Sequence, residues 1–231
     1  MDEKRKNRIK HDKLPSKDDL IVDYIKDQLE EKMQASAMDI NVFCKDGMVH
    51  MYGMVDVLAE KKLAENIAKN IDDVRKIENK ITVAMDSSIS DKHMEKEVIN
   101  RLTGAAHSEE LTGVGVRVED GVANLMGTAD TLQQAHEAMN LASQVRGIKD
   151  VVNNIQVATG EYDDAIINSR ITQALSITDI SYQDIAHSVK KGRVTLDGYV
   201  DDRHQMETAK EIAMGVEGVR KVVNQLKLRK K

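Results

Sequence analysis

Apolar residues recur every fourth position in three separate segments of the chain. Each segment has three such residues: Ile21, Ile25 and Leu29; Met94, Val98 and Leu102; Ile167, Ile171 and Leu175. A step of four predicts a surface helix with one apolar face. An aspartate lies near the start of each segment, where an N-cap residue accepts free backbone N–H groups, namely Asp18, Asp91 and Asp164.

Apolar residues then alternate with polar ones in two segments that flank a glycine. The first alternates at Ile40, Val42 and Cys44; Val114, Val116 and Val118; Ile185, His187 and Val189; the second alternates at Val49, Met51 and Val55; Ala123, Leu125 and Ala129; Val194, Leu196 and Val200. Period two on both sides of Asp-Gly or Lys-Gly predicts a β-hairpin in which Gly47, Gly121 and Gly192 supply a positive φ. A second glycine at an inward position predicts either close approach of a helix or a bulge, at Gly53, Gly127 and Gly198.

A second helix and a third strand complete the pattern. The helix carries alanines three and four residues from larger apolar residues, which predicts close packing, and its end is predicted at Gly147 and Gly218, where the first copy has Asp73. The strand spans 77–83, 151–157 and 222–228. An equivalent inward asparagine is predicted to bond to local backbone at Asn79, Asn153 and Asn224.

These features recur three times at a nearly constant spacing, so the chain is a triplication. Because a strand–helix–strand connection is normally a right-handed parallel crossover, each α-β-β-α-β repeat should form a mixed three-stranded sheet with both helices on one face, an α+β fold. The predicted repeats span 18–86, 91–158 and 163–229, and residues 1–17 form a basic arm that is predicted to be disordered. Units this small are near the lower limit for folding alone, so contacts between them are expected.

The opposite face of each sheet is left open by this arrangement. In the first repeat it carries Asn41, Phe43, His50, Tyr52 and Met54, and it is the most apolar of the three. Several apolar side chains together on one sheet face usually mark a contact. We expect this face to be covered by a neighbouring repeat or by a second copy of the chain, with candidate interface residues Phe43, Tyr52, Met54 and Met126.

Composition narrows the class of protein. The net charge is −5 and charged residues of both signs are plentiful, which is typical of a globular chain. No apolar run is long enough to span a membrane, and the start lacks the apolar core of a signal peptide. The compartment stays open: cytoplasmic if the chain is complete as given, or periplasmic if a signal was removed.

The sequence shows no catalytic constellation. Its seven histidines have no metal-ligand spacing, and there is no phosphate-binding glycine loop, nucleophile elbow or RNA-binding Gly-x-x-Gly clamp. We therefore predict no enzyme activity, no cofactor, no metal and no nucleic-acid partner. His187 takes a position that is valine in the other repeats, so it is either a pH sensor or a histidine hydrogen-bonded at the edge of the core.

The repeated motifs resemble the BON domain, the bacterial osmotic-shock and nodulation domain. The third repeat carries them best, in Lys-Gly-Arg-Val-Thr-Leu-Asp-Gly-Tyr-Val at 191–200 and Gly-Val-Arg-Lys-Val-Val-Asn-Gln-Leu at 218–226. The second matches well, and the first departs at Asp73 and Glu78. The resemblance implies a non-enzymatic module, often periplasmic, associated with osmotic stress, envelope integrity and binding of phospholipid surfaces.

Two hypotheses for function follow. The first is peripheral binding to anionic phospholipid surfaces in envelope maintenance or the osmotic-stress response, with candidate contacts Lys4, Arg5, Lys6, Arg8, Lys10, Lys227 and Arg229. The second is a protein–protein scaffold or self-assembling adaptor that acts through the open sheet faces and forms a homo-oligomer.

Overall fold

The structure, a computed structural model, describes residues 15–33, 39–71, 73–84, 88–104, 111–158, 160, 162–178, 180 and 182–229. The first repeat comprises α1 (Lys17–Met33), β1 (Ile40–Lys45), β2 (Met48–Val55), α2 (Leu58–Lys69) and β3 (Lys76–Val83). The second comprises α3 (Asp91–Leu102), β4 (Val114–Glu119), β5 (Val122–Ala129), α4 (Leu132–Ser143) and β6 (Asp150–Val157). The third comprises α5 (Asp164–Ser176), the 3-10 turn η2 (Tyr182–Asp184), β7 (Ile185–Lys190), β8 (Arg193–Val200), α6 (Arg203–Met214), β9 (Lys221–Asn224) and β10 (Lys227–Leu228).

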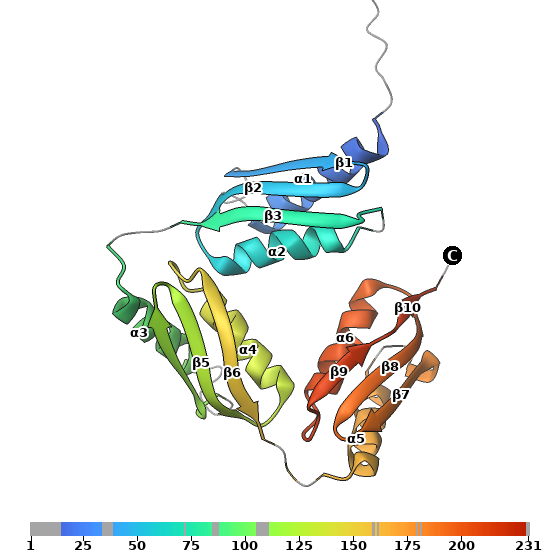
Figure 1. The fold of residues 1–231 in the computed structure, drawn as a ribbon. Coiled ribbons are helices and arrows are strands. Elements are labelled where there is room, and N and C mark those ends of the chain that lie inside the picture. Colours follow the sequence, from blue (N-terminus) through green and yellow to red (C-terminus); the bar gives the residue numbers. More distant parts are fainter. Residues whose placement is uncertain are drawn as a thin grey trace, which may run out of the picture. The chain divides into compact units, whose positions relative to one another are not determined.

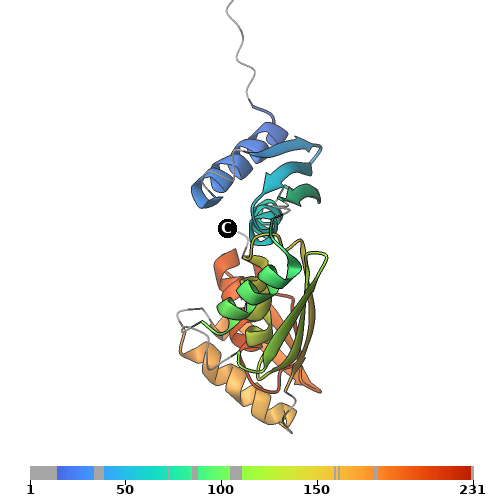
Figure 2. The ribbon, with the colours of Figure 1, turned by 90° about the vertical axis from the view of Figure 1, so that its left-hand side faces the viewer.

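Each repeat builds one sheet whose central strand is the second strand of the hairpin. The orders are β1-β2-β3 and β4-β5-β6, and β8 lies between β7 and the pair β9 and β10. The hairpins are antiparallel, whereas β6 pairs with β5, and β9 with β8, in parallel. In each repeat both helices cover one face of the sheet, as Figures 1 and 2 show. The predicted α+β fold with three mixed sheets is confirmed.

The three copies correspond without gaps from the second strand onward. A single constant offset carries the bounds of β2, α2 and β3 onto those of β5, α4 and β6, and a second constant offset carries β5 and α4 onto β8 and α6. In the third repeat the last strand is divided into β9 and β10. Both pair with β8 in the same register, and between them Gln225 N donates to Leu196 O at 2.8 Å. The first helix differs most, with 17 residues in α1 against 12 in α3.

The core of each repeat lies between the sheet and its two helices. The four-step residues of the first helices are all buried, and so are most of the inward residues of the hairpins. Ala68, Ala142 and Ala213 have no exposed surface, because the second helix lies close against the sheet where a larger side chain would hold it away. Asn79, Asn153 and Asn224 each accept a hydrogen bond from a backbone N–H two residues later, as predicted.

The predicted ends of the second helices were wrong. Helix α4 ends at Ser143 and α6 at Met214, four residues before Gly147 and Gly218. These glycines lie in the following turn with φ of +88° and +86°, a conformation that favours glycine. A Cβ at Gly147 would also lie 2.7 Å from Met94 Sδ, so the turn passes directly against the first helix.

Candidate functional site

An aspartate at the start of each first helix binds the hairpin turn, and we call this contact the aspartate latch. The carboxylate of Asp18 accepts from Asp46 N at 2.8 Å and Gly47 N at 3.0 Å. The equivalent bonds run from Asp120 N and Gly121 N to Asp91 at 2.8 and 2.9 Å, and from Lys191 N and Gly192 N to Asp164 at 2.7 and 2.9 Å.

The predicted N-cap role of these aspartates was therefore wrong. Ser90 caps α3 by accepting from His93 N, and Asp163 caps α5 by accepting from Ala165 N. Asp91 and Asp164 are the next residues along, inside the first helical turn, and their carboxylates point at the hairpin instead.

The turn that the latch holds has the predicted hairpin geometry. Gly47, Gly121 and Gly192 have φ between +72° and +76°, and the residues before them also have positive φ, at +53° for Asp46, +51° for Asp120 and +53° for Lys191. Two consecutive positive φ values are what a type I′ turn requires. The glycine carbonyl accepts from the N–H of Arg75, Lys149 or Arg220, each at 2.8 Å, so the turn is fixed between the first helix and the third strand.

The latch shifts the acidity of its aspartates. Hydrogen bonds from Gly47 N and then Asp46 N lower the pKa of Asp18, and the charge of Arg75 adds to this. Hydrogen bonds from Gly192 N and then Lys191 N lower the pKa of Asp164, with a further contribution from Arg220. Both latches are therefore formed by ionised carboxylates at neutral pH.

The second glycine of each hairpin has a different neighbour from the one predicted. Gly53, Gly127 and Gly198 have φ of +141°, +108° and +121°. A Cβ there would lie about 2 Å from a backbone carbonyl oxygen just before the first strand, at 1.9 Å from Asp39 O, 2.0 Å from Gly113 O and 2.0 Å from Asp184 O. These positions require glycine because φ is positive and because the carbonyl of the residue before the first strand lies so close. The predicted reasons, a closely packed helix or a bulge, do not apply, since the strand register is regular.

Cys44 and His187 each have a local role. The Cys44 thiol donates to Asp18 Oδ1 at 3.2 Å, and burial together with this carboxylate raises the pKa of Cys44 to about 11. His187 is partly buried, and its Nε2 lies 3.2 Å from Thr172 Oγ1 and 3.3 Å from Asn168 O on α5. The histidine is thus hydrogen-bonded at the edge of the core, one of the two alternatives above.

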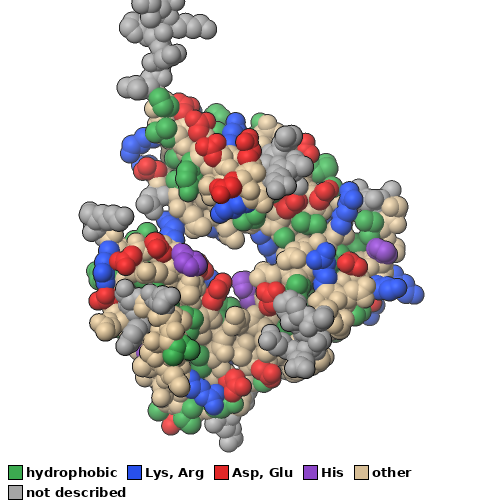
Figure 3. Space-filling model, turned by 180° about the vertical axis from the view of Figure 1, so that it is seen from behind, with side chains coloured by type: hydrophobic (Ala, Val, Ile, Leu, Met, Phe, Trp, Pro, Cys, Tyr) green, Lys and Arg blue, Asp and Glu red, His purple; other side chains and the backbone are tan. Residues whose placement is uncertain are grey.

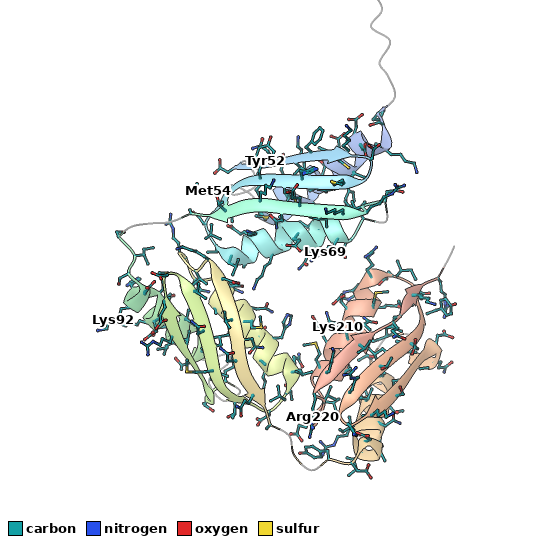
Figure 4. The ribbon with its side chains drawn as sticks, in the orientation of Figure 1. Tyr52, Met54, Lys69, Lys92, Lys210 and Arg220 are labelled. Atoms are coloured by element: carbon teal, nitrogen blue, oxygen red, sulfur yellow. The ribbon has the colours of Figure 1, made fainter. Side chains whose placement is uncertain are left out.

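The outer sheet face of the first repeat presents apolar side chains. Phe43, Tyr52 and Met54 are 55%, 53% and 53% exposed, and Figure 4 labels Tyr52 and Met54 along β2. Phe43 lies opposite His50 in the register, with ring centroids 6.3 Å apart, and His50 Nδ1 lies 2.7 Å from Glu78 Oε2. An apolar group bordered by polar side chains is typical of a protein contact surface.

The corresponding faces of the other repeats are more polar. In the second, Met126 is 43% exposed opposite Gly115, beside Arg117 and Thr128. In the third, Tyr199 is 53% exposed, and Ala186, Ser188, Thr195 and Asp197 lie on the same face of the hairpin. That a partner covers Phe43, Tyr52, Met54 or Met126 stays a prediction.

The candidate lipid contacts fall into three groups. Lys4, Arg5, Lys6, Arg8 and Lys10 lie outside the described residues. Lys227 is exposed on β10, next to Tyr199 in the register. Arg229 forms ion pairs with Asp184 and, at 3.4 Å, with Asp201, so its charge is neutralised by carboxylates of its own repeat.

The described ranges hold neither a metal cluster nor a membrane-spanning helix. Among these residues no group of three or more His, Cys, Asp or Glu side chains could hold a metal ion. No helix in that part of the chain is both long and apolar enough to cross a membrane. Acidic and basic side chains are intermingled on the surface seen in Figure 3.

The family model of the BON domain matches residues 17–85, 90–159 and 163–230. The chain belongs to the BON domain family. It is 31% identical over 124 residues to osmotically-inducible protein Y of Escherichia coli (strain K12), covering 50% of this chain and 62% of that protein. It is 28% identical over 145 residues to the 21 kDa hemolysin of Actinobacillus pleuropneumoniae, covering 59% of this chain and 73% of the relative.

This BON protein thus spans less than two thirds of the length of osmotically-inducible protein Y. Among solved structures, CdsD, a structural protein of the type III secretion system of Chlamydia trachomatis, is similar over 90% of this chain and 92% of its own, with 15% identity and a TM-score of 0.26.

Proposed function

We propose that this triple-BON protein is a non-enzymatic binding protein of the osmotic-stress response or envelope maintenance that associates peripherally with anionic phospholipid surfaces. The observation that carries the proposal is membership of the BON family, three times over, together with similarity to an osmotically inducible relative. The family resemblance supplies the phospholipid surface as the ligand.

The distribution of charge supports the third repeat as the part that meets such a surface. Residues 18–86 hold nine Lys and Arg against fifteen Asp and Glu, and residues 91–158 hold six against ten. Residues 163–229 hold ten against ten. An anionic surface repels a negative body within about a Debye length, roughly 8 Å in physiological salt, so the third repeat is repelled least.

The test is co-sedimentation of the full chain with vesicles. Vesicles of phosphatidylcholine alone are compared with vesicles that contain 30% phosphatidylglycerol, each in about 50 mM and 500 mM salt. We expect binding only to the anionic vesicles and only in low salt. Equal recovery with both vesicle types, or no binding to either, contradicts the proposal.

A second candidate function is a protein–protein scaffold, and the exposed face of the first repeat favours it. Phe43, Tyr52 and Met54 form the apolar part of this face, and each keeps more than half of its surface exposed among the residues that the structure describes. The sheet edges β1 and β3 flank the same face. The two functions are compatible, since they use different repeats.

A further inference from the structure

The hairpin end of the third repeat gathers five basic residues, which we call the basic tip: Lys190, Lys191, Arg193, Arg220 and Lys221. All five are exposed. They come from the two strands of the β7–β8 hairpin, from its turn, from the residue before β9 and from the first residue of β9. The tip is therefore assembled by the fold from two separate segments of the chain, with α6 between them.

Register places these residues side by side. Lys190 lies directly opposite Arg193 in the antiparallel pair, and Arg193 lies beside Lys221 in the parallel pair. A Cβ on Gly192 would lie 3.0 Å from Arg220 Cγ, so the Arg220 side chain, labelled in Figure 4, passes over the turn. Like charges that face each other across strands destabilise a sheet, so the cluster carries a cost in stability.

The positive charge of the tip is largely uncompensated. In the described part of the chain, no carboxylate lies within ion-pair distance of any of the five basic groups. Among the described residues, two carboxylates lie in the segments that adjoin the tip. Asp164 is engaged by the turn N–H groups and faces Arg220, and Glu217 accepts from Arg170 at 2.9 Å and from Tyr162 at 2.7 Å.

The same end of the second repeat shows that the backbone does not require this charge. There the equivalent residues are Glu119, Asp120, Val122, Lys149 and Asp150, on the same strands with the same latch. Lys191 also holds a φ of +53°, in a region that favours Asp or Asn over lysine. The lysine is thus a poorer residue for the turn than the aspartate at that position in the second repeat.

We propose that the basic tip is the site through which the third repeat docks on an anionic phospholipid surface, with the lysine and arginine side chains contacting headgroup phosphates. The inference rests on the proposed function and assigns it to one end of one repeat. Five exposed basic groups gathered at one end of a repeat supply the clustered positive charge that reversible peripheral binding to such a surface requires.

A nucleic acid is a poorer fit to this site. Binding of single strands uses aromatic faces on which bases stack. One aromatic ring packed at this end is that of Tyr162, which lies against the Gly218 turn. Its face is covered by the Arg170 guanidinium at 4.6 Å, and its hydroxyl donates to Glu217.

The experiment transfers the second repeat's own tip residues to the third, in the full chain. The variant K190E/K191D/R193V replaces each residue by its counterpart from a hairpin with the same backbone, and K191D places a favoured residue at the positive φ, so folding is preserved. Binding to vesicles with 30% phosphatidylglycerol in about 50 mM salt should weaken about a hundredfold. The control K26E/K32E changes the net charge by a similar amount at two exposed residues of α1 and should bind like the parent.

The reverse transfer, E119K/D120K/V122R, should strengthen binding by at least tenfold. If the parent binds anionic vesicles and the tip variant binds equally well, the basic tip is excluded while the proposed function stands. If the parent does not bind at all, the proposed function fails and the tip with it. The tip variant is also tested for binding to a 20-nucleotide poly-dT strand and for self-association in sedimentation. If it loses either of these while its vesicle binding is unchanged, the lipid assignment is overturned in favour of that partner.

Discussion

The first repeat presents Phe43, Tyr52 and Met54 on its open sheet face, whereas the third presents a single large apolar side chain, Tyr199, among polar ones there and gathers basic residues at its hairpin end. Beneath these surfaces the two repeats have the same strands, the same latch and the same pair of hairpin glycines. The residues that shape the backbone are shared, and the exposed residues are not. Function in this protein therefore has to be inferred from the surfaces of single repeats rather than from the fold they share.

The largest effect is expected where the repeats are alike. Gly127→Val should destabilise the second repeat by roughly 1–3 kcal/mol, because its Cβ would overlap Gly113 O and its φ of +108° is unfavourable for valine. Gly115→Val on the facing strand is the matched control, since a Cβ there meets only Met126 at 3.9 Å and Met126 O at 4.0 Å. Thermal unfolding by circular dichroism distinguishes them. Equal melting curves for the two variants contradict the crossing carbonyl as the reason for glycine, and Gly53 and Gly198 should behave like Gly127.

The aspartate latch should give a pH-dependent effect of the same sign in the first and third repeats. Because the folded-state pKa of Asp18 and Asp164 is lowered from 3.8, the stability they contribute is present above that pH and is lost as pH falls through the lowered pKa. Asp164→Asn should lower Tm at neutral pH, and the difference from the parent should shrink below about pH 3.8. Asp197→Asn, on the exposed face of β8, is the control and should leave Tm unchanged. A deficit of Asp164→Asn that stays constant down to pH 2 would rule out the ionised latch.

The contrast between the open faces is tested by Phe43→Ser combined with Tyr52→Ser. If a neighbouring repeat covers the face, the three repeats of the variant should be less compact, as measured by small-angle scattering. If a second copy covers it, the variant should have a lower mass in sedimentation. Tyr199→Ser on the equivalent face of the third repeat is the control, and it should leave both unchanged. Should shape, mass and Tm of the double variant all stay as in the parent, the scaffold function loses its residue-level support.

The smallest effect concerns a residue that only the first repeat has. Cys44 stands where the other repeats have Val118 and Val189, and its thiol is buried with a pKa of about 11. Cys44→Val should change stability by less than about 1.5 kcal/mol, because the volumes are similar and only one weak hydrogen bond is lost. In the parent, a maleimide reagent at pH 7 should label Cys44 only after unfolding. Rapid labelling of the native protein is incompatible with this environment.

The sequence predicted the order of elements and the correspondence of the repeats because both depend on local periodicity. The predicted role of Asp164 was wrong because Asp163 precedes it and either aspartate could cap the helix. Only the fold shows that Asp164 binds the N–H groups of the distant hairpin instead. The neighbour predicted for Gly127 was wrong, since a carbonyl brought close by strand pairing leaves no trace in the apolar pattern. The charge of Arg229 alone predicts a lipid contact. Its partners Asp184 and Asp201 lie before β7 and after β8, and only the folded sheet brings them to it.

The basic tip is not evident from the local sequence, for a related reason. Lys190, Lys191 and Arg193 are close in sequence and were visible as part of the hairpin, but Arg220 and Lys221 join them only when β9 pairs with β8. Comparing the charge of equivalent positions among the three repeats would have found the cluster, because Glu119 and Asp120 in the second copy stand where the third has two lysines.

The latch also bears on the order in which each repeat is completed during synthesis. The first helix leaves the ribosome before the turn that its aspartate binds, since the first strand and the loop before it lie between them in the chain. Until that turn exists, the helix has neither its hairpin N–H donors nor the sheet on which its apolar face packs, and an isolated helix of 12 residues is marginal in water. We therefore expect the hairpin to form first and then to stabilise the helix in the segment synthesised before it. This order should repeat in each of the three repeats as the chain is synthesised.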